Sequence, residues 1–321
     1  MTIDDWRPGA TLQRLRQRAE ILEKIRAFFK QRGVMEVDTP ALASATTADP
    51  AIASVAVRLH CRPGSLFYLQ TSPEFAMKRL LAAGSGPIYQ LGKVFRDDEI
   101  GRLHQVEFTL LEWYQPGYDD VRLVDELGEL LTYLGAPPIS RIAYRDAFER
   151  FARVDPFNAD ERSLHAALRS QGIELAPSLA AAGRDVLLDL LMSHVVGPRL
   201  GRAGPQALVD YPAAQAAYAR IKAGTPSVAA RFEVFVDGIE LANGYHELTD
   251  AAEQRRRLEA QNAARRSAGQ PEVPVDERLL AALENGLPDC AGVALGFDRL
   301  VMWLLGEGFL SAVIPFDLDR A

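Results

Sequence analysis

Cysteine is scarce in this chain of 321 residues, which contains only Cys61 and Cys290. Their spacing fits no metal-binding pattern, so we exclude a cysteine-based metal site and a disulfide, and interpret both as reduced packing residues. Long apolar runs are absent as well. No stretch approaches the roughly eighteen uncharged apolar residues of a membrane span, and the N-terminus carries no apolar core of a signal peptide. We therefore expect a cytoplasmic protein.

The chain also lacks an excess of positive charge. Its 36 Lys and Arg residues are outnumbered by 43 Asp and Glu residues, for a net charge of −7. This argues against a protein that coats nucleic acid, although it leaves room for a local basic patch. Repeats and low-complexity segments are absent too. With 48% hydrophobic and 25% charged residues, the composition is that of a globular protein with a substantial core.

The stretch LGKVFRDDEIGRLHQVEFTLLEWY, residues 91–114, predicts two strands joined by a polar loop. Hydrophobic residues over 88–95 indicate the first strand, and alternation over 106–114 indicates the second. Glu112 falls on an otherwise apolar face of the second strand, together with Tyr114. Because burying an unpaired carboxylate costs several kcal/mol, we expect the matching cation to belong to a ligand.

Near the N-terminus, apolar residues recur at helical spacing over residues 12–32, and Gly33 is a typical C-terminal stop. Residues 34–37 then indicate a strand that leads into Thr39-Pro40. On pattern alone, this segment is a core helix followed by a core strand.

Residues from about 140 to 205 are rich in Ala and Leu at helical spacing. We predict a helical excursion there, within a single domain that spans residues 1–321. His194 in this stretch is more typical of a structural or surface histidine than of a ligand.

Asp237-Gly238 lies between two alternating apolar runs and predicts a two-residue hairpin turn. This turn pairs Phe235 with Glu240, so Glu233 and Glu240 become diagonal cross-strand neighbours on one face. Two neighbouring carboxylates repel unless a cation lies between them. Mg²⁺ prefers such hard oxygen ligands, together with waters and nucleotide phosphates. The pattern alone equally allows a surface hairpin with two solvated glutamates.

Three segments, in this order, resemble the motifs of the class II aminoacyl-tRNA synthetases. GVMEVDTP at 33–40 resembles motif 1, residues 91–114 resemble motif 2 of the lysine branch, and GVALGFDR at 292–299 resembles motif 3. TSPEFAMKRL at 71–80 and ELANGYHEL at 240–248 also match. The resemblance implies an α+β fold with a class II catalytic core, mainly antiparallel β-sheet flanked by helices, and a homodimer formed through motif 1.

The resemblance also assigns an ATP site. It implies that Arg96 contacts the α-phosphate and Arg299 the γ-phosphate, while His104 helps to hold the triphosphate. Charge builds on the α-phosphorus as a carboxylate attacks it, so positioned cations are the catalytic groups and no side-chain nucleophile is required. The implied magnesium ligands are Glu233 and Glu240. The remaining ATP-binding positions that the resemblance implies are Asp97, Asp98, Glu240, Leu241 and Gly296.

The motif 2 loop contains one departure from the family pattern. Lysine-branch enzymes usually carry Arg-Asn-Glu, whereas this chain has Arg96-Asp97-Asp98-Glu99. Asp98 takes the place of the glutamate that recognises the adenine amino group. Its side chain is shorter, so Glu99 is an alternative for this role.

For the amino-acid substrate, the resemblance implies that Glu112 and Glu247 receive a side-chain ammonium with help from Tyr114, and that Glu74 receives the other amine. Three carboxylates match the charge of a small dication. For Glu74 alone, a helix N-terminal residue favoured by the helix dipole is the simpler interpretation. The implied substrate-binding set is Ser72, Pro73, Glu74, Glu112, Tyr114, Asn243, Tyr245, Glu247 and Ala294.

This assignment raises a geometric difficulty. In a regular strand, Asn243, Tyr245 and Glu247 share one face, and Glu240 lies on the opposite face. The resemblance nevertheless implies that all four reach one pocket. Because an Asn-Gly pair in a strand often marks a bulge, we expect a kink at Asn243-Gly244 that turns Glu247 toward the substrate.

A narrower resemblance decides the expected function. The motif 1 helix begins close to the start of the chain, which leaves no room for the anticodon-binding domain of lysyl-tRNA synthetases, so we expect no tRNA partner. Ala294 stands where those enzymes usually have glycine. From Trp6 to Arg320 the chain resembles the ligase family that activates (R)-β-lysine with ATP and attaches it to a lysine ε-amino group of elongation factor P. The extra methyl fits an amine displaced by one carbon.

Two other functions stay open. A free-standing lysine-type amino-acid or tRNA ligase would keep the same site but use another acceptor. A non-catalytic regulatory paralogue would have lost a phosphate-binding arginine or a metal carboxylate, yet all of these residues are present. The arginines from Arg255 to Arg266 either meet a tRNA-shaped partner or form a solvated charged face.

Overall fold

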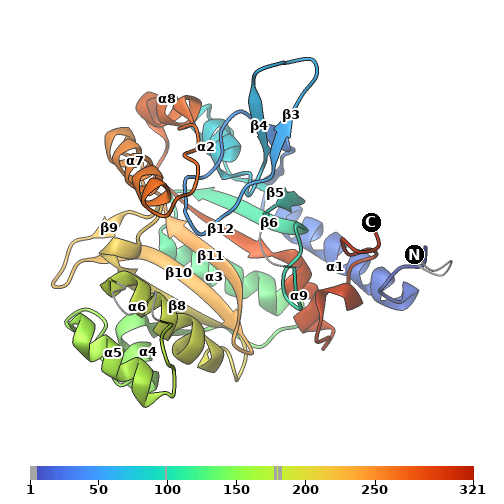
Figure 1. The fold of residues 1–321 in the computed structure, drawn as a ribbon. Helices are drawn as coiled ribbons and strands as arrows, with labels where there is room; N and C mark the ends of the chain where they lie inside the picture. Colours follow the sequence, from blue (N-terminus) through green and yellow to red (C-terminus); the bar gives the residue numbers. More distant parts are fainter. Residues whose placement is uncertain (1–5, 98–99, 177–178, 180–182) are drawn as a thin grey trace. The chain divides into compact units, whose positions relative to one another are not determined.

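The computed structural model describes residues 6–97, 100–176, 179 and 183–321. The chain divides into two compact units. Unit 1 comprises Met1–Gly117 and Leu248–Ala321, and unit 2 comprises Tyr118–Glu247. Figure 1 shows how the elements of each unit follow one another along the chain.

Unit 1 combines helices with a four-strand portion of a mixed sheet. Its helices are α1 (Leu12–Gln31), α2 (Glu74–Ala82), α7 (Ala251–Ser267), α8 (Glu277–Gly286), α9 (Phe297–Leu304) and the short 3₁₀ helix η5 (Leu310–Ala312). The strands are β1 (Met35–Glu36), β2 (Leu42–Ala43), β3 (Ala56–Arg58), β4 (Leu66–Leu69), β5 (Ile88–Phe95), β6 (Glu107–Pro116) and β12 (Cys290–Gly296). In the order β1, β5, β6 and β12, only the first pair is parallel. The order β2, β4, β3 forms a separate antiparallel sheet.

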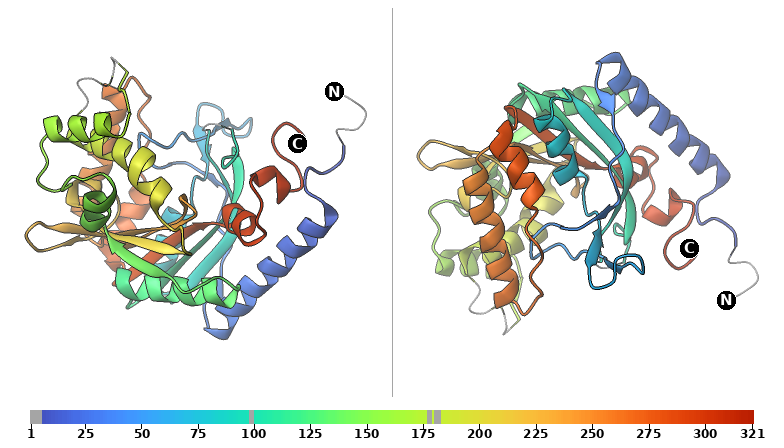
Figure 2. Two further views of the ribbon diagram at one scale, coloured as in Figure 1. Left: turned by 90° about the horizontal axis from the view of Figure 1, so that it is seen from below. Right: turned by 90° about the horizontal axis from the view of Figure 1, so that it is seen from above.

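Helix α1 covers part of the sheet that contains β5 and β6, as the two views of Figure 2 allow the reader to follow. Thr11 caps its N-terminus by accepting a hydrogen bond from a backbone N–H of the first turn. Phe29 stacks on Tyr89 of β5 at 4.5 Å between ring centroids and meets Trp113 of β6 edge-on at 5.4 Å. The predicted helix is confirmed. The buried residues of α1 are Ile21, Ile25, Phe28 and Phe29.

Unit 2 contains the helices from α3 to η4 and its own run of strands. Its helices are α3 (Asp120–Tyr133), α4 (Tyr144–Phe151), α5 (Glu161–Ser170), α6 (Arg184–Leu191), the π-helix η2 (Met192–Val196) and the 3₁₀ helices η3 (Gly197–Arg199) and η4 (Ala213–Gln215). The strands are β7 (Ser140–Ala143), β8 (Gln206–Pro212), β9 (Ile221–Lys222), β10 (Val228–Val236) and β11 (Ile239–His246). β11, β10, β8 and β7 are adjacent in this order, with β9 beside β10. Only β7 and β8 run parallel. The mainly antiparallel strands and flanking helices confirm the predicted α+β fold class.

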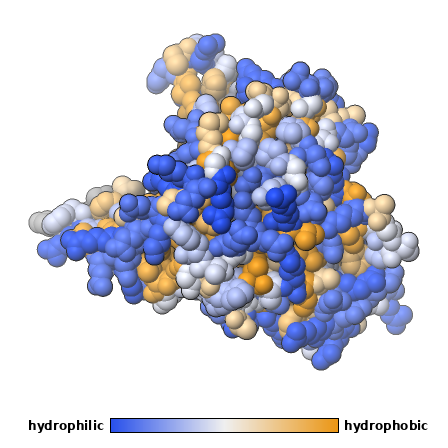
Figure 3. Space-filling view, turned by 180° about the vertical axis from the view of Figure 1, so that it is seen from behind, coloured by the Kyte–Doolittle hydropathy of each residue, from blue (hydrophilic) through white to orange (hydrophobic). Residues whose placement is uncertain are grey.

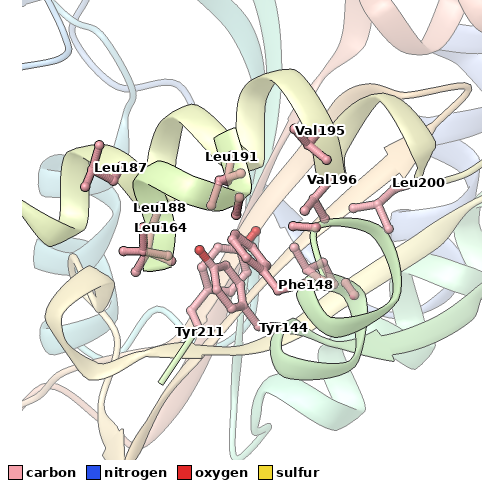
Figure 4. Packing of buried hydrophobic residues seen from close by; sticks show 14 of the residues in the cluster. Tyr144, Phe148, Leu164, Leu187, Leu188, Leu191, Val195, Val196, Leu200 and Tyr211 are labelled. Carbon is pink, nitrogen blue, oxygen red and sulfur yellow. The ribbon is translucent and has the colours of Figure 1, made fainter. Parts of the chain in front are cut away.

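The helices of unit 2 enclose an apolar cluster that rests on β8 and β10 (Figure 4). At its centre, Tyr144 and Phe148 stack at 4.4 Å, and Tyr211 of β8 approaches Tyr144 at 4.9 Å. Phe235 of β10 joins the cluster, and Tyr245 of β11 packs against it. This packing fixes the strand face on which several predicted site residues lie. The prediction of a single domain stays a prediction.

Apolar groups are interspersed with hydrophilic ones on the face drawn in Figure 3. His194 is exposed, as expected for a surface histidine, and its Nδ1 lies 2.8 Å from the Ser193 hydroxyl. Both cysteines are free, but only Cys290 is buried. The packing interpretation is therefore wrong for Cys61, which is exposed because it lies in the loop after β3. Among the described residues, no helix is both long and apolar enough to cross a membrane.

Candidate active site

The motif 2 hairpin forms as predicted from β5 and β6, with Ile88 paired to Tyr114 at one end. Glu112 is 2% exposed. It lies directly across from Gln90 of β5 and from Ala294 of β12. Directly opposed residues of antiparallel strands project to the same side, so the methyl group of Ala294 is a neighbour of the Glu112 carboxylate.

Neutral hydroxyl groups hold the Glu112 carboxylate. Ser72 donates to one oxygen at 2.7 Å, and Tyr114 donates to the other at 2.8 Å. Burial raises the pKa of Glu112 to about 7, and the negative charge of Glu74 adds to the increase. The hydrogen bonds from Ser72 and Tyr114 and the charge of Lys78 oppose it. Glu112 is therefore buried with hydroxyl donors, and it forms no direct ion pair with a cation among the residues that the structure describes.

The Ser72-Pro73-Glu74 segment begins helix α2. Pro73 occupies the N-cap position, and the Ser72 hydroxyl accepts a hydrogen bond from the Glu74 N–H at 3.0 Å. Glu74 thus lies in the first turn, where the helix dipole favours a carboxylate. Lys78, one turn later, donates to Oε1 of Glu74 at 2.6 Å. The structure therefore brings Ser72, Pro73, Glu74, Glu112, Tyr114 and Ala294 together within unit 1.

The two arginines that the resemblance assigns to phosphate binding occupy different parts of unit 1. Arg96 follows β5, donates to the Thr71 carbonyl at 3.4 Å through two nitrogens, and lies 5.2 Å from the ring centroid of Phe108. Arg299, in the first turn of α9, lies 2.9 Å from Nε2 of His104. The residues assigned to the triphosphate end are thus in direct contact, although they are far apart in the sequence.

Two residues outside the predicted set fix α9. Asp298 is buried and accepts from the Thr109 N–H of β6 at 2.7 Å. Its other oxygen lies 2.5 Å from Arg18 of α1. These contacts hold the helix turn that carries Arg299. Only tertiary pairing reveals them, because no spacing in the sequence links Arg18 to Asp298.

The remaining motif 2 and motif 3 positions are only partly described. The Asp97 N–H donates to the Ala53 carbonyl at 2.8 Å, which fixes the backbone after Arg96. Gly296 is the N-cap residue of α9. Asp98 and Glu99, the two alternatives for adenine recognition, lie outside the described residues.

In unit 2, the β10–β11 hairpin has the predicted turn and the predicted pairing of Phe235 with Glu240. The register then shifts, because the next pair is Val234 with Ala242 and Leu241 has no partner in the ladder. The bulge therefore lies at Leu241. The expected kink at Asn243-Gly244 is wrong, since Gly244 pairs regularly with Phe232. Leu241 and Ala242 are both buried, so their packing sets the bulge position.

The bulge nevertheless resolves the difficulty of strand parity. On the turn side of the bulge, Glu240 pairs with Phe235. On its other side, Glu233 pairs with Asn243 and Arg231 pairs with Tyr245. All of these residues share one face of the hairpin. The amide of Asn243 donates to the Tyr245 hydroxyl at 2.7 Å. Glu233 and Glu240 are on the same face, as predicted.

Arg231, a cation of the protein itself, lies on this face of the hairpin. The Arg231 guanidinium lies 2.5 Å from Glu233, donates to Oδ1 of Asn243 at 3.3 Å, and donates to the Gln215 carbonyl at 2.8 Å. It also lies 4.5 Å from the ring centroid of Tyr211. Burial opposes the charge of Arg231, but neighbouring Glu233 raises the pKa of Arg231 above its usual value. Alternation places Arg231 and Glu233 on one face, so this partner was within reach of the sequence pattern.

Glu247 ends unit 2 at a buried position, with 1% exposure. It forms an isolated bridge with Ala219, and its carbonyl accepts from Arg220 at 2.7 Å. Glu247 and the carboxylates of unit 1 belong to different units, so the convergence of all three acids stays a prediction.

Four of the five arginines of α7 pair with carboxylates, whereas the buried Arg265 donates to the carbonyls of Pro271 and Asp49. The ion pairs are Arg255–Glu277 at 2.6 Å, Arg256–Glu253, Arg257–Glu253 at 2.9 Å and Arg266–Glu272 at 2.9 Å. Of the two interpretations, this pairing favours a solvated charged face.

Comparison with known proteins identifies the family of this chain. Residues 3–320 match the family described as tRNA synthetases class II (D, K and N). The chain is 49% identical over 325 residues to a protein of Edwardsiella ictaluri named elongation factor P–(R)-β-lysine ligase, and the match covers 98% of both chains. Proteins of the same name from Salmonella paratyphi B and Salmonella choleraesuis are 46% identical, again over 98% of each chain. The chain therefore belongs to the class II tRNA synthetase family.

Proposed function

We propose that this protein activates (R)-β-lysine with ATP and transfers it to a lysine ε-amino group of elongation factor P. The observation that carries the proposal is the hydrogen-bonded cluster of Ser72, Glu74, Glu112 and Tyr114, with Ala294 directly across from the buried Glu112. This pocket occurs in a chain that is 49% identical to a ligase of that name over 98% of both chains.

The proposed reaction takes place in two steps, adenylate formation and transfer of the aminoacyl group. A carboxylate oxygen of the amino acid attacks the α-phosphorus, the bond to pyrophosphate breaks, and an aminoacyl-adenylate forms. The acceptor amine then attacks the acyl carbon, an amide bond forms, and AMP leaves. Charge builds on phosphate oxygens in the first step, so we assign Arg96 to the α-phosphate and Arg299 with His104 to the γ-phosphate. The contact between Arg299 and His104 supports their shared role.

The amino-acid pocket requires ionised carboxylates for two ammonium groups. Glu112 and Glu247 receive one amine, with Tyr114 nearby, and Glu74 receives the other. Asn243 and Tyr245 complete the substrate side. A charge-assisted hydrogen bond is roughly twice as strong as a neutral one, so the proton state of Glu112 decides how well the amine binds. Binding a cation beside this carboxylate favours the loss of its proton.

The remaining residues of the proposed ATP site lie on strands and in loops. Asp97, Leu241 and Gly296 contact the nucleotide, and Asp98 is assigned to the adenine. Glu233 and Glu240 fit Mg²⁺, because two carboxylates on one strand face supply hard oxygen ligands and leave positions for phosphate oxygens. Bound Mg²⁺ would neutralise phosphate charge. No cluster of three or more His, Cys, Asp or Glu residues suited to a metal occurs in the described part of the chain.

The proposal extends to assembly and compartment. We propose a homodimer through motif 1, which is supported by the exposed apolar side chains of Leu12 and Met35, at 65% and 48%, and by the position of β1 at the end of the strand order in unit 1. We propose that elongation factor P, rather than tRNA, is the acceptor, and that the protein works in the cytoplasm without a membrane partner.

The function is tested by ATP–pyrophosphate exchange with (R)-β-lysine and with α-lysine, followed by a charging assay with lysine tRNA. We expect exchange with the β-isomer and no charged tRNA. If neither isomer supported exchange, the proposed ligase activity would be contradicted. Robust lysyl-tRNA formation would instead favour a free-standing tRNA ligase. Light scattering tests the dimer, which a well-behaved monomer would rule out.

A further inference from the structure

Helix α2 carries a lysine in the interior of unit 1. The Lys78 side chain is 2% exposed, although lysine is almost never fully buried unless it is paired. Its Nζ lies 2.6 Å from Oε1 of Glu74, whose side chain is 14% exposed. Removing one partner of a buried pair leaves an uncompensated charge at a cost of several kcal/mol. The position of Glu74 is therefore coupled to the presence of Lys78.

The pair also connects to Glu112. The Glu74 N–H donates to the Ser72 hydroxyl, and the same hydroxyl donates to Glu112. The charge of Lys78 lowers the pKa of Glu112, whereas burial and the charge of Glu74 raise it. One ammonium thus acts on two carboxylates, directly on one and through space on the other.

The groups that surround Glu112 in unit 1 come from each neighbouring element. Helix α2 supplies the charges of Glu74 and Lys78, β6 supplies the hydroxyl of Tyr114, and the segment before α2 supplies the hydroxyl of Ser72. The residues directly across from Glu112 are the neutral Gln90 and Ala294. Without Lys78, two negative charges would share this buried region, and one carboxylate would take up a proton.

We propose that Lys78 is a positioning residue for amine recognition: it holds Glu74 in place and offsets the negative charge that Glu74 brings near Glu112 before the substrate arrives. This rests on the proposed function of the pocket. Lys78 also prevents the pocket from holding two unbalanced negative charges, so the substrate ammonium has a prepared partner. The substrate itself is bound by the carboxylates.

The test compares Lys78→Met with a matched control, Lys93→Met. Lys93 also pairs with a glutamate, Glu107, at 3.1 Å, but both side chains are 52% exposed. In ATP–pyrophosphate exchange at pH 7, we expect Lys78→Met to raise the KM for (R)-β-lysine about 10- to 100-fold, the factor of one hydrogen bond to a charged group. The KM for ATP should stay within about twofold, and Lys93→Met should match wild type.

The pH profile separates positioning from a structural role. The KM of Lys78→Met should fall as the pH is raised above 7, because Glu112 then loses its proton. In the double variant Lys78→Met/Glu74→Gln, the unbalanced charge of Glu74 is gone, so folding should recover and the pH profile should return toward wild type. Its KM should stay high. A Lys78→Met enzyme with the wild-type KM and pH profile would overturn the proposal, as would a double variant with the profile of Lys78→Met.

A measurement without substrate distinguishes failure of this inference from failure of the proposed function. Carbon NMR of glutamate carboxyl groups follows Glu112 in wild type and in Lys78→Met. We expect the titration midpoint, about 7 in wild type, to move to higher pH in the variant. An unchanged midpoint would overturn the role of Lys78, even if exchange confirms the ligase. A shifted midpoint without any exchange would leave the electrostatic role standing and contradict the function.

Discussion

Each unit of this protein contains two carboxylates with a cation beside them, partly buried in unit 2 and buried in unit 1, and the two sites are built differently. In unit 2, Arg231 pairs directly with Glu233 and also donates to Asn243. In unit 1, Lys78 pairs with Glu74, while Glu112 is held by neutral hydroxyls. The first arrangement places a cation in direct contact with a carboxylate. The second leaves a carboxylate that exchanges its proton near neutral pH.

This difference suits the two ligands that we assign. A divalent metal binds deprotonated carboxylates, and in unit 2 the Arg231 guanidinium lies beside Glu233, one of the two proposed ligands. An ammonium substrate brings its own proton donors, so Glu112 can start with a pKa of about 7 and ionise fully as the amine binds. The predictions below test each half of the comparison.

Removal of Arg231 should have the largest effect. Arg231→Met leaves Glu233, whose side chain is 11% exposed, without its cation, so we expect a loss of about 3–5 kcal/mol in the free energy of unfolding by urea. Arg231→Met/Glu233→Gln should recover most of this loss. As a control, Arg141→Met breaks a pair with Asp125 whose side chains are 39% and 60% exposed, and should cost about 1 kcal/mol or less. Equal losses at both positions would contradict a special role for Arg231.

Loss of the second carboxylate of unit 2 should stop chemistry rather than folding. Glu240→Gln removes charge at constant volume, so we expect adenylate formation to fall by about 10²–10³-fold or more, with an unchanged circular dichroism spectrum. ATP–pyrophosphate exchange over a range of Mg²⁺ concentrations measures this. The exposed Glu149 of the same unit is the control, since Glu149→Gln should keep wild-type exchange. Near-normal exchange by Glu240→Gln would rule out the metal assignment.

The raised pKa of Glu112 should make stability depend on pH. Between pH 4.5 and about 7, the unfolded chain loses this proton while the folded chain retains it. The folded state then binds more protons, so the free energy of unfolding falls as the pH rises through this window. The contribution is about 3 kcal/mol at most. Urea unfolding across the window should show a smaller decrease for Glu112→Gln than for wild type, and parallel curves would contradict the shift.

The smallest effect concerns the neighbour of Glu112. Ala294→Gly removes one methyl across from this carboxylate, so the preference for (R)-β-lysine over α-lysine should narrow by roughly 1–3 kcal/mol at most. The ratio of kcat/KM for the two isomers in the exchange assay measures it. Wild type without any preference would show that Ala294 does not determine the isomer.

Local patterns in the sequence predicted the elements that carry the site. The hydrophobic run over residues 88–95 coincides with β5, and Asp237-Gly238 gives the predicted turn between β10 and β11. The bulge was placed wrongly because glycine is the usual local signal, whereas the buried packing of Leu241 and Ala242 decides its position.

Contacts between segments far apart in the sequence could not be predicted from local sequence patterns. The ion pair of Arg18 with Asp298 joins distant segments, and its existence follows only from the packing of α1 against α9. Lys78 is an intermediate case. Its spacing of four residues from Glu74 is a helical ion-pair signal, but the sequence does not show that the pair is buried beside Glu112.

The most direct test of the central claim is mass spectrometry of elongation factor P after incubation with this protein, ATP and (R)-β-lysine. We predict that the acceptor gains the mass of one lysyl group on a single lysine side chain, more efficiently than with α-lysine, and that Glu240→Gln produces no gain. An elongation factor P that gains no such mass with either isomer, while ATP–pyrophosphate exchange proceeds, would contradict the proposed acceptor.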